Sequence, residues 1–509
     1  MALRFLKALT IERVALFTMA FVAAVALPLI DPDYFWHLET GEFTLFNGAL
    51  PQTDPFSYTM EGRAWVAHEW LFQCILYLLH NSVGRIGVQL FTAVMTVLAL
   101  NVAFSTSASS LTSRGPRLVL LSITLLLFMP FISPRPQLAT YLLFATYLWV
   151  LLRAKYSGCT RWLPVLPLTM ILWVNLHGGY LLGIVLVWLF LTTEIMSHWR
   201  NLGSQANRSY FRKLTLTAIA TLLASAANPD FVYHWLYPFQ VMGMDLANSL
   251  ITEWQSPNFH LLTFKWYLLA IISFYAAQCF RQTRPDATEF LLPSFIFAAG
   301  FVALRHIPLA LLTWLPFMAR AIADNRWYLQ LIAWYSQRSN KGKQLGDTEY
   351  ILNWVVLAVI VAVLVLFKAG GSERDIEQLN EVVPAKATDF ILAEGISGRM
   401  FNTYKFGGYL IHRLYPQEKV FIDGRADMYG DEFIADYAGI YFGQPGWKEL
   451  FESYNIDYVI CSNNAVFRQL LLEWGVFKLV YEDEDNSVLV RDIPKFRELI
   501  RRSVIDVSE

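Results

Sequence analysis

Long apolar segments recur along most of this 509-residue chain. Windows of about 15 to 20 mainly apolar residues follow one another from Val14 almost to Phe367, and each is long enough to cross, or nearly cross, a bilayer. Charged residues make up only 16% of the chain, below the roughly 25% of soluble proteins. This composition excludes a soluble enzyme, a secreted disulfide scaffold and a disordered chain. It predicts a polytopic α-helical membrane protein.

The windows predict about 11 to 12 membrane helices. The N-terminal sequence MALRFLKALTIER resembles the charged region of a signal peptide, but the many later spans favour an uncleaved first helix. The windows lie near residues 12–30, 69–82, 87–104, 117–132, 137–152, 162–174, 180–197, 214–227, 261–280, 288–304, 306–319 and 350–368.

Charge is divided unevenly along the chain. Residues 372–509 hold about 24 acids and about 15 bases, close to −9, and the rest of the chain is close to +8. Because Lys and Arg collect in cytoplasmic loops, the basic clusters between alternate windows indicate which loops face outward. The sequence predicts a membrane domain (1–370), with a first outer loop at about 31–68, and an extracytoplasmic domain (371–509). The basic clusters are at 153–161, 200–213, 281–284 and 320–326.

The number of early apolar windows does not fit the predicted orientation. Three windows separate the first outer loop from the segment SPRPQ (133–137), which the same rule places outside. An odd number of full crossings cannot join two outward points, so one window is predicted to be re-entrant or interfacial.

The acidic tail has the pattern of a small soluble α/β domain. KVFID (419–423), IDYVICS (456–462) and SVLVRD (487–492) read as strands. Segments around 430–441, 446–454 and 464–474 read as helices between them. Alternating helices and strands predict an open sheet with flanking helices.

Polar side chains interrupt the apolar pattern on the predicted outer side. Ionisable groups are costly to bury in a membrane, so they tend to be paired or functional. Acids, histidines and arginines on one face of a helical bundle suit an anionic substrate and a proton acceptor. The candidate catalytic residues are Asp33 and Asp31, and the candidate substrate-binding residues are His37, His68, Glu69, Arg135, Asn175, His177, Glu253, Arg305 and His306.

These residue types fit glycosyl transfer from a lipid phosphate. The planar fork of an arginine suits the phosphate, a carboxylate can accept the proton of the attacking hydroxyl, and fixed cations can stabilise the departing phosphate. The four scattered cysteines support neither a disulfide framework nor a zinc site. No cofactor is predicted with certainty, and a divalent cation is compatible with this chemistry but not indicated.

Each candidate also has a structural interpretation. For Asp31, a helix-capping role and a functional role are equally compatible with the sequence. For Asp33, the presence of His37 one turn later favours a functional role. His68 and Glu69 stand beside two tryptophans, as an interfacial anchor would, and the arginines can bind ordinary lipid phosphates. In the tail, Asp423 and Arg425 of IDGR follow a predicted strand, where ligands often bind. A turn held by an Asp–Arg pair is slightly favoured for both.

Several motifs, taken together and in order, resemble one family. DPDYFWHLETGE, PQTDPFSYT and HEWL, then NLHGGY, ITEWQSP, RHIP and FGGYLIHRLYP with VFIDGR, are similar to bacterial multispan proteins of the GT-C glycosyltransferase superfamily. The resemblance is to proteins close to the mannosyltransferase-like and 4-amino-arabinose-transferase-like branches. The resemblance covers most of the chain, and in better-studied branches adjacent acids occupy the place where a proline here separates Asp31 and Asp33.

The resemblance implies an inverting transfer from a polyprenyl-phosphate-linked sugar to a glycan, lipid or protein acceptor. The reaction would occur on the periplasmic face of a bacterial inner membrane, with Asp33 as general base and Asp31 as the alternative. No nucleic acid is expected as a partner. The alternatives are a transporter or flippase of lipid-linked sugars, a glycan polymerase or ligase, and an assembly protein whose tail is the working part.

Overall fold

The structure, a computed structural model, describes residues 10–26, 31–111, 113–199, 205–338, 347–369, 379 and 382–506. The chain divides into two compact units. The helical unit comprises Met1–Leu27, Arg85–Pro238 and Ile251–Ala369, and the α/β unit comprises Pro28–Gly84, Phe239–Leu250 and Gly370–Glu509. Residues 1–9, 27–30, Arg200 and the predicted boundary at 370–371 lie outside the described residues.

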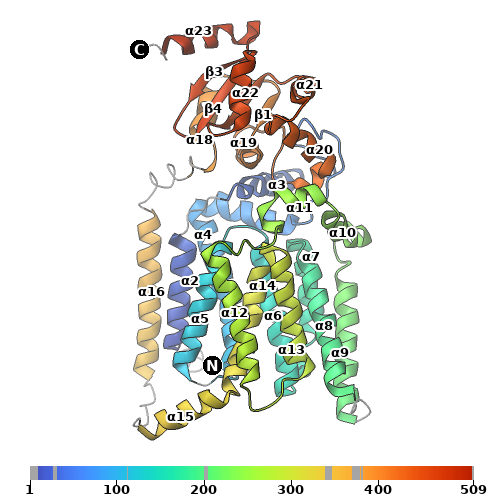
Figure 1. Cartoon of the computed structure of the whole chain (residues 1–509), viewed down its shortest axis with the longest axis vertical. Coiled ribbons are helices and arrows are strands. Elements are labelled where there is room, and N and C mark those ends of the chain that lie inside the picture. The colour runs from blue at the N-terminus through green and yellow to red at the C-terminus, as the bar shows by residue number, and fades with distance from the viewer. Residues whose placement is uncertain are drawn as a thin grey trace. The chain divides into compact units, whose positions relative to one another are not determined.

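Most helices of the helical unit run side by side, whereas α15 (Arg326–Arg338) lies obliquely across their ends, as Figure 1 shows. Short 3-10 turns join several of them: η1 (Met129–Phe131), η2 (Thr160–Trp162), η4 (Phe231–Trp235), η5 (Thr252–Trp254) and η6 (Leu304–His306). The helices are α2 (Ile11–Ala26), the second part of α4 (Trp70–Ala108), α5 (Arg114–Phe128), α6 (Gln137–Ser157), α7 (Val165–Leu176), α8 (Tyr180–His198), α9 (Gln205–Ala224), α12 (Leu262–Cys279), α13 (Ala287–Val302), α14 (Ile307–Ala323), α15 (Arg326–Arg338) and α16 (Asp347–Ala369).

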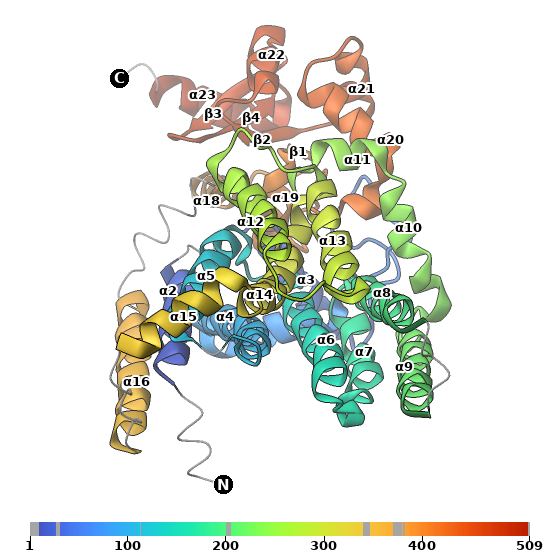
Figure 2. The ribbon, with the colours of Figure 1, turned by 60° about the horizontal axis from the view of Figure 1, so that its bottom comes forward.

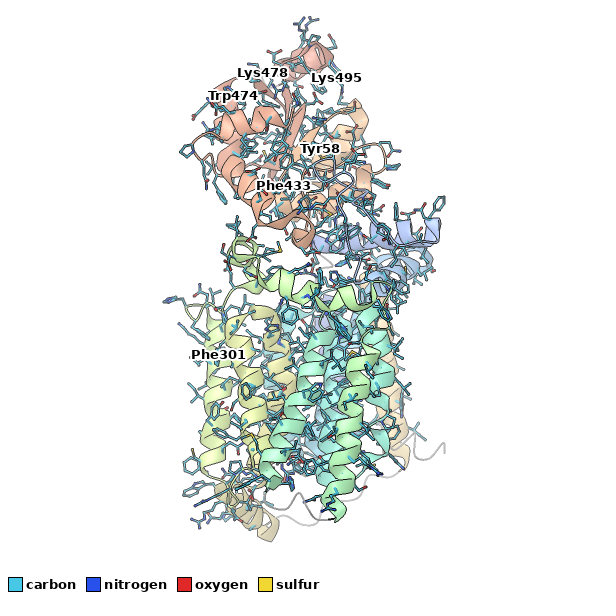
Figure 3. The ribbon with its side chains drawn as sticks, turned by 90° about the vertical axis from the view of Figure 1, so that its right-hand side faces the viewer. Tyr58, Phe301, Phe433, Trp474, Lys478 and Lys495 are labelled. Carbon is cyan, nitrogen blue, oxygen red and sulfur yellow. The ribbon has the colours of Figure 1, made fainter. Side chains whose placement is uncertain are left out.

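Buried aromatic side chains pack in the centre of this unit, and the two large buried tryptophans each donate a local hydrogen bond. The Trp173 indole donates to Thr140 Oγ1 at 2.9 Å, and the Trp314 indole donates to the Ala270 carbonyl at 2.8 Å. Because a buried polar group without a partner is costly, these bonds allow large amphipathic rings to pack in an apolar core. Phe301, labelled in Figure 3, packs at the edge of the same core.

Within the described residues, five helices are long and apolar enough to cross a membrane. Ala287–Val302 and Ile351–Val363 are apolar but shorter. The described residues of each predicted window lie mainly in helices. The prediction of a mainly helical membrane protein with a C-terminal sheet-and-helix domain is confirmed, whereas the number of crossings stays a prediction. The five are Trp70–Ala108, Arg114–Phe131, Gln137–Ser157, Tyr180–His198 and Leu304–Ala323.

Helix α4 has a backbone break between two of the early windows. It contains two predicted windows, 69–82 and 87–104, and the backbone breaks between them at Gly84, where φ is 71° and ψ is −162°. A left-handed φ is a conformation that glycine adopts without a steric cost. The part before the break belongs to the α/β unit. This division is compatible with the prediction that one early window is re-entrant or interfacial, which stays a prediction.

The α/β unit is built on a four-stranded mixed sheet in the order β1-β2-β4-β3. β1 (Met400–Asn402) pairs parallel with β2 (Tyr458–Ser462), whereas β4 (Asn486–Arg491) pairs antiparallel with both β2 and β3 (Phe477–Glu482). The helices are α3 (Asp33–Asn47), the first part of α4, α11 (Asp245–Leu250), α18 (Ala385–Glu394), α19 (Gly407–Leu414), α20 (Ala426–Tyr441), α21 (Trp447–Ser453), α22 (Val466–Trp474) and α23 (Arg497–Asp506), with turns η7 (Tyr404–Phe406) and η8 (Pro494–Phe496). α10 (Tyr237–Met242) begins in the helical unit and ends in this one.

Two of the three predicted strands and all three predicted helices of this unit are present, whereas the prediction of a strand at KVFID (419–423) was wrong. That segment lies outside the sheet and has an isolated parallel bridge from Val420 to Ser57. The side chain of Asn402 supplies the missing partner, because its Oδ1 accepts from the Phe421 amide at 2.9 Å and its Nδ2 donates to the Ile422 carbonyl at 2.8 Å. A buried amide thus replaces a neighbouring strand.

The first loop packs against the tail as part of the same unit, whereas the sequence-based division placed it with the membrane region. Tyr58, labelled in Figure 3, donates its hydroxyl to the Met400 carbonyl at 2.9 Å. Thr59 donates to the Phe421 carbonyl at 2.6 Å. These bonds join positions that are more than 300 residues apart in the sequence.

A fully buried ion network holds the loop and the tail together. The Arg425 guanidinium donates to Asp54 at 2.7 Å and to Asp423 at 2.6 Å, and all three side chains are inaccessible to solvent. Burial alone lowers the pKa of Arg425, but the two carboxylates raise its pKa by more, so that the guanidinium stays charged. The Trp65 ring lies 4.5 Å from the guanidinium carbon, and Tyr429 donates to Asp423 at 2.7 Å.

We predict that Arg425→Ala destabilises the α/β unit by about 3–5 kcal/mol, because it leaves two carboxylates buried without their cation. The measurement is denaturant unfolding of the detergent-solubilised protein, followed by tryptophan fluorescence. The control is Arg413→Ala, whose partner Asp389 is 64% exposed, and an exposed ion pair contributes about 1 kcal/mol or less. Equal losses in the two variants would contradict a structural role for the buried network.

Candidate functional site

The two first-loop aspartates lie at the start of α3 in different roles. Asp31 Oδ1 accepts the backbone N–H of Asp33 at 3.0 Å, and the Asp31 carbonyl accepts from the Tyr34 N–H at 3.1 Å. This contact supports the capping interpretation of Asp31. Asp33 is the first residue of α3 and half-buried, and its Oδ1 accepts from the Trp36 indole at 3.1 Å.

Two glycines of the tail motifs pack closely against the start of α3, where a side chain would clash. A Cβ at Gly424, within IDGR, would lie 2.0 Å from Asp33 Oδ1. A Cβ at Gly408, within FGGY, would lie 2.5 Å from the Pro32 carbonyl oxygen. The Asp33 carboxylate therefore rests directly against the backbone of the tail, and both positions exclude any larger residue.

The other first-loop candidates collect beside Trp36. His37 is buried, with its ring centroid 3.7 Å from that of Trp36, and its Nδ1 is 3.1 Å from Gln73 Nε2. Glu69 lies between two histidines, with its oxygens 3.7 Å from His37 Nδ1 and 3.5 Å from His68 Nε2. Asp33, His37, His68 and Glu69 thus belong to one region of the α/β unit.

The environment of His68 favours its protonated form. Burial by itself lowers the pKa of the imidazole, but the charge and hydrogen bond of Glu69 outweigh it. The Asp427 carboxylate and the Val66 carbonyl act in the same direction, so the pKa of His68 is raised above its ordinary value.

A second cluster forms in the helical unit, where two predicted arginines meet. Arg135, just before α6, forms an ion pair with Glu253 of η5. The guanidinium carbon of Arg305, in η6, lies 5.1 Å from the ring centroid of Trp254. Because η5 packs against η6, the side chains of adjacent residues 253 and 254 bring the two arginines to one place.

His306 and His177 are held by local bonds in the same unit. His306 Nδ1 lies 3.2 Å from the Ala299 carbonyl, an acceptor, so this nitrogen carries a proton. His177 Nδ1 accepts from the Gly179 N–H at 3.1 Å and lies 2.7 Å from Thr140 Oγ1. Since the amide can only donate, the neutral His177 ring carries its proton on Nε2.

The hydrogen bonds of Asn175 that the structure describes are structural. Its Nδ2 donates to the carbonyls of Ile171 at 2.8 Å and Ala227 at 2.7 Å. Its Oδ1 accepts from the Asn228 amide at 3.3 Å. These bonds join the end of α7 to the segment after α9.

The structure brings the predicted residues together as two groups. The α/β unit holds the first-loop candidates with Asp423 and Arg425, whose complete burial favours the structural interpretation of this pair. The helical unit holds Arg135, Glu253, Arg305, His306, Asn175 and His177. A single pocket made from both groups stays a prediction.

Sequence reasoning missed several partners of these residues. Trp36 and Gly424 contact Asp33, Trp254 contacts Arg305, and Asp54 contacts Arg425. Glu39 also pairs with His412 at 2.6 Å, and burial raises the pKa of that carboxyl although His412 opposes the shift. All lie within or next to the motifs that carried the family resemblance. Among the described residues, no group of three or more His, Cys, Asp or Glu is placed to hold a metal ion.

Comparison with family models finds no match, and neither does comparison with curated protein sequences. Solved structures do match. The archaeal oligosaccharyltransferase AglB from Archaeoglobus fulgidus, in complex with an inhibitory peptide and a dolichol-phosphate, aligns with a TM-score of 0.52 and 10% identity. The alignment covers 88% of this chain and 69% of that one.

Two further structures of the Archaeoglobus fulgidus oligosaccharyltransferase align over the same shares with a TM-score of 0.51 and 10% identity. One is the apo form, and the other is tethered to an acceptor peptide containing the NVT sequon. At this identity the likeness concerns the fold. The chain shares the fold of these oligosaccharyltransferase structures, and the part of it that the structure describes contains five helices long and apolar enough to cross a membrane.

The raised pKa of His68 predicts a pH-dependent contribution to stability. A group whose pKa is higher in the folded state stabilises the protein below its unfolded pKa, here about 6.5, and loses that contribution as the pH rises through the folded value. We expect the thermal midpoint of the wild-type protein to be higher than that of His68→Gln at about pH 6. The difference between the two midpoints should become smaller by about pH 9. The test is thermal unfolding of both proteins across this range. A difference that grows with pH would contradict the assigned protonation.

Proposed function

We propose that this protein is an inverting glycosyltransferase that moves a sugar from a polyprenyl-phosphate-linked donor to an acceptor on the extracytoplasmic face of a bacterial inner membrane. The GT-C fold over 88% of the chain supports the class. The solved structures of that fold contain a dolichol-phosphate and an acceptor peptide. A lipid phosphate and an acceptor bearing a nucleophile are the ligand classes that we propose here.

Asp33 is the proposed general base, and its placement is the observation that carries the proposal. The carboxylate is half-buried, oriented by the Trp36 indole and backed by Gly424. The hydrogen bond from the Trp36 indole orients the Asp33 carboxylate through Oδ1. A carboxylate has two oxygens with several acceptor sites, so such a bond is compatible with accepting a proton. A base held in one orientation accelerates proton transfer more than a mobile one does.

The reaction is a single displacement at the anomeric carbon. The acceptor oxygen or nitrogen forms a bond to that carbon while the bond from the carbon to the phosphate oxygen breaks. The acceptor proton passes to Asp33, and the polyprenyl phosphate leaves with the bonding electron pair. One displacement inverts the configuration of the sugar. No oxidant or reductant is required.

Arg135 and Arg305 are the proposed stabilisers of the leaving phosphate. Charge grows on the phosphate oxygens as the bond breaks, and guanidinium groups held in place beforehand stabilise that charge. Trp254 fixes one arginine by ring stacking, and Glu253 holds the other by an ion pair. Since a carboxylate repels an anion, we assign Glu253 a positioning role rather than direct contact with the phosphate.

Asp33→Asn is expected to lower transfer by about 10²–10⁴-fold, because an amide cannot accept the proton. The matched control is Asp31→Asn, whose amide oxygen can still accept the Asp33 N–H and which is expected to retain activity. Mass spectrometry of envelope glycans in a deletion strain complemented with each variant measures the product. Full product with Asp33→Asn and none with Asp31→Asn would reassign the base to Asp31.

Arg135→Ala and Arg305→Ala are each expected to weaken the binding of undecaprenyl phosphate by about tenfold or more, the effect of losing a charge-assisted hydrogen bond. The dissociation constant is measured with the purified protein in detergent. Arg161→Ala serves as the control. The guanidinium carbon of Arg161 also lies over a tryptophan, 5.3 Å from the ring centroid of Trp162, but Arg161 follows the opposite end of α6 from Arg135. Equal binding by all variants would indicate that the two arginines do not contact the phosphate.

A further inference from the structure

A polar cavity of about 510 Å³ lies in the helical unit at the C-terminal end of α6. Lys155 and Tyr156 of α6, Glu194 and His198 of α8, and Tyr210 and Lys213 of α9 line it. α8 packs against both α6 and α9, and Figure 2 shows these three helices in one region of the helical unit. The volume of the cavity is within the range of small-molecule binding sites.

The cavity and the Arg135 cluster are at opposite ends of α6. A helix of 21 residues is about 30 Å long, which is the thickness of the hydrocarbon core. The cavity is therefore at the depth of one lipid headgroup layer. Trp199 is 65% exposed and Trp162 is 36% exposed at the same end, and amphipathic rings are typical of that layer.

A buried ion network forms the inner wall of the cavity and carries a net negative charge. Lys155 pairs with both Glu194 and Asp286, so that one positive charge is opposed by two negative ones. Glu194 also accepts from Thr288 at 2.6 Å and from Tyr210 at 3.0 Å. Asp286 caps α13 by accepting from the Glu289 N–H at 2.9 Å, and its side chain is 36% exposed. Of the two carboxylates, Glu194 is buried and Asp286 is the one that solvent reaches.

Cationic and donor groups form another part of the wall. Lys213 is exposed, with its Nζ 3.2 Å from Thr160 Oγ1. The His198 ring bonds through Nδ1 to the Glu194 carbonyl at 3.0 Å. The Ser209 hydroxyl also lines the cavity. An ammonium, an imidazole and hydroxyls together suit a phosphate group.

We propose that this cavity binds a ligand carrying both a phosphate and a primary ammonium, the headgroup chemistry of phosphatidylethanolamine. The phosphate contacts Lys213 and His198, and the ammonium contacts Asp286. A purely anionic headgroup leaves the negative wall without a counterion, and a choline headgroup cannot donate a hydrogen bond from its methylated nitrogen. This site is distinct from the proposed transfer site and does not depend on it.

Native mass spectrometry of the full-length protein in detergent tests the proposal with three lipids: phosphatidylethanolamine, phosphatidylglycerol and phosphatidylcholine. We expect the first to bind about tenfold more tightly than the other two, the effect of one charge-assisted hydrogen bond. Equal binding of the three lipids by the wild-type protein would overturn the proposal without any need for a variant.

Two substitutions separate the two halves of the headgroup. Asp286→Asn keeps an oxygen to cap α13 but loses the charge, so it should weaken phosphatidylethanolamine about tenfold and leave phosphatidylglycerol unchanged. Lys213→Ala should weaken both lipids about tenfold. Arg212→Ala is the matched control, since Arg212 is an exposed neighbour on α9 outside the cavity lining, and should change neither. An Arg212→Ala loss equal to that of Lys213→Ala would indicate non-specific attraction and overturn the site.

A competition experiment distinguishes a lipid ligand from a soluble ligand with the same headgroup. Free O-phosphorylethanolamine is added in competition with phosphatidylethanolamine. Displacement of the lipid only at millimolar concentrations supports a lipid ligand, whereas tighter binding of the free compound supports a soluble ligand of the same chemistry. No displacement at any concentration would contradict headgroup recognition in this cavity.

Discussion

The burial of Arg425 is the constraint on which the α/β unit depends. A guanidinium inaccessible to solvent must be paired, and it is paired with one carboxylate of the tail and one of the first loop. Because Asp54 and Arg425 are 371 positions apart, neither segment can complete this core alone. The loop that holds Asp33 is therefore folded against the tail, and Gly424, next to Arg425, reaches the Asp33 carboxylate.

This dependence changes how the tail is understood. A tail that merely shapes acceptor entry could be removed and leave a working membrane part behind. Here, removal of residues 372–509 would expose Asp54 and take away the backbone against which Asp33 rests. Loss of activity on deletion would then follow from loss of the first-loop structure. Substitutions that keep this core, such as those at Asp31 and Asp33, separate catalysis from folding more cleanly.

The helical unit places its charges at the two ends of its apolar helices. Arg135 and Glu253 stand at one end of α6, and Lys155 with Glu194 and Asp286 stands at the other. Between them the helix is apolar and mostly buried. Charges in such a protein are stable only where they are paired or reach the polar layers of the membrane. One end accordingly suits a lipid phosphate as substrate, and the other suits a lipid headgroup as a bound ligand.

The sequence by itself determined the helices, since apolar windows of membrane length have few alternative structures, and its motif order indicated the GT-C fold. It also predicted that the acids and histidines of the first loop matter together, and Asp33, His37, His68 and Glu69 are neighbours in the folded unit. It could not show that KVFID pairs with the first loop and with Asn402, or that the break at Gly84 divides α4 between two units. Those features depend on contacts between residues far apart in the chain, and local periodicity carries no record of such contacts.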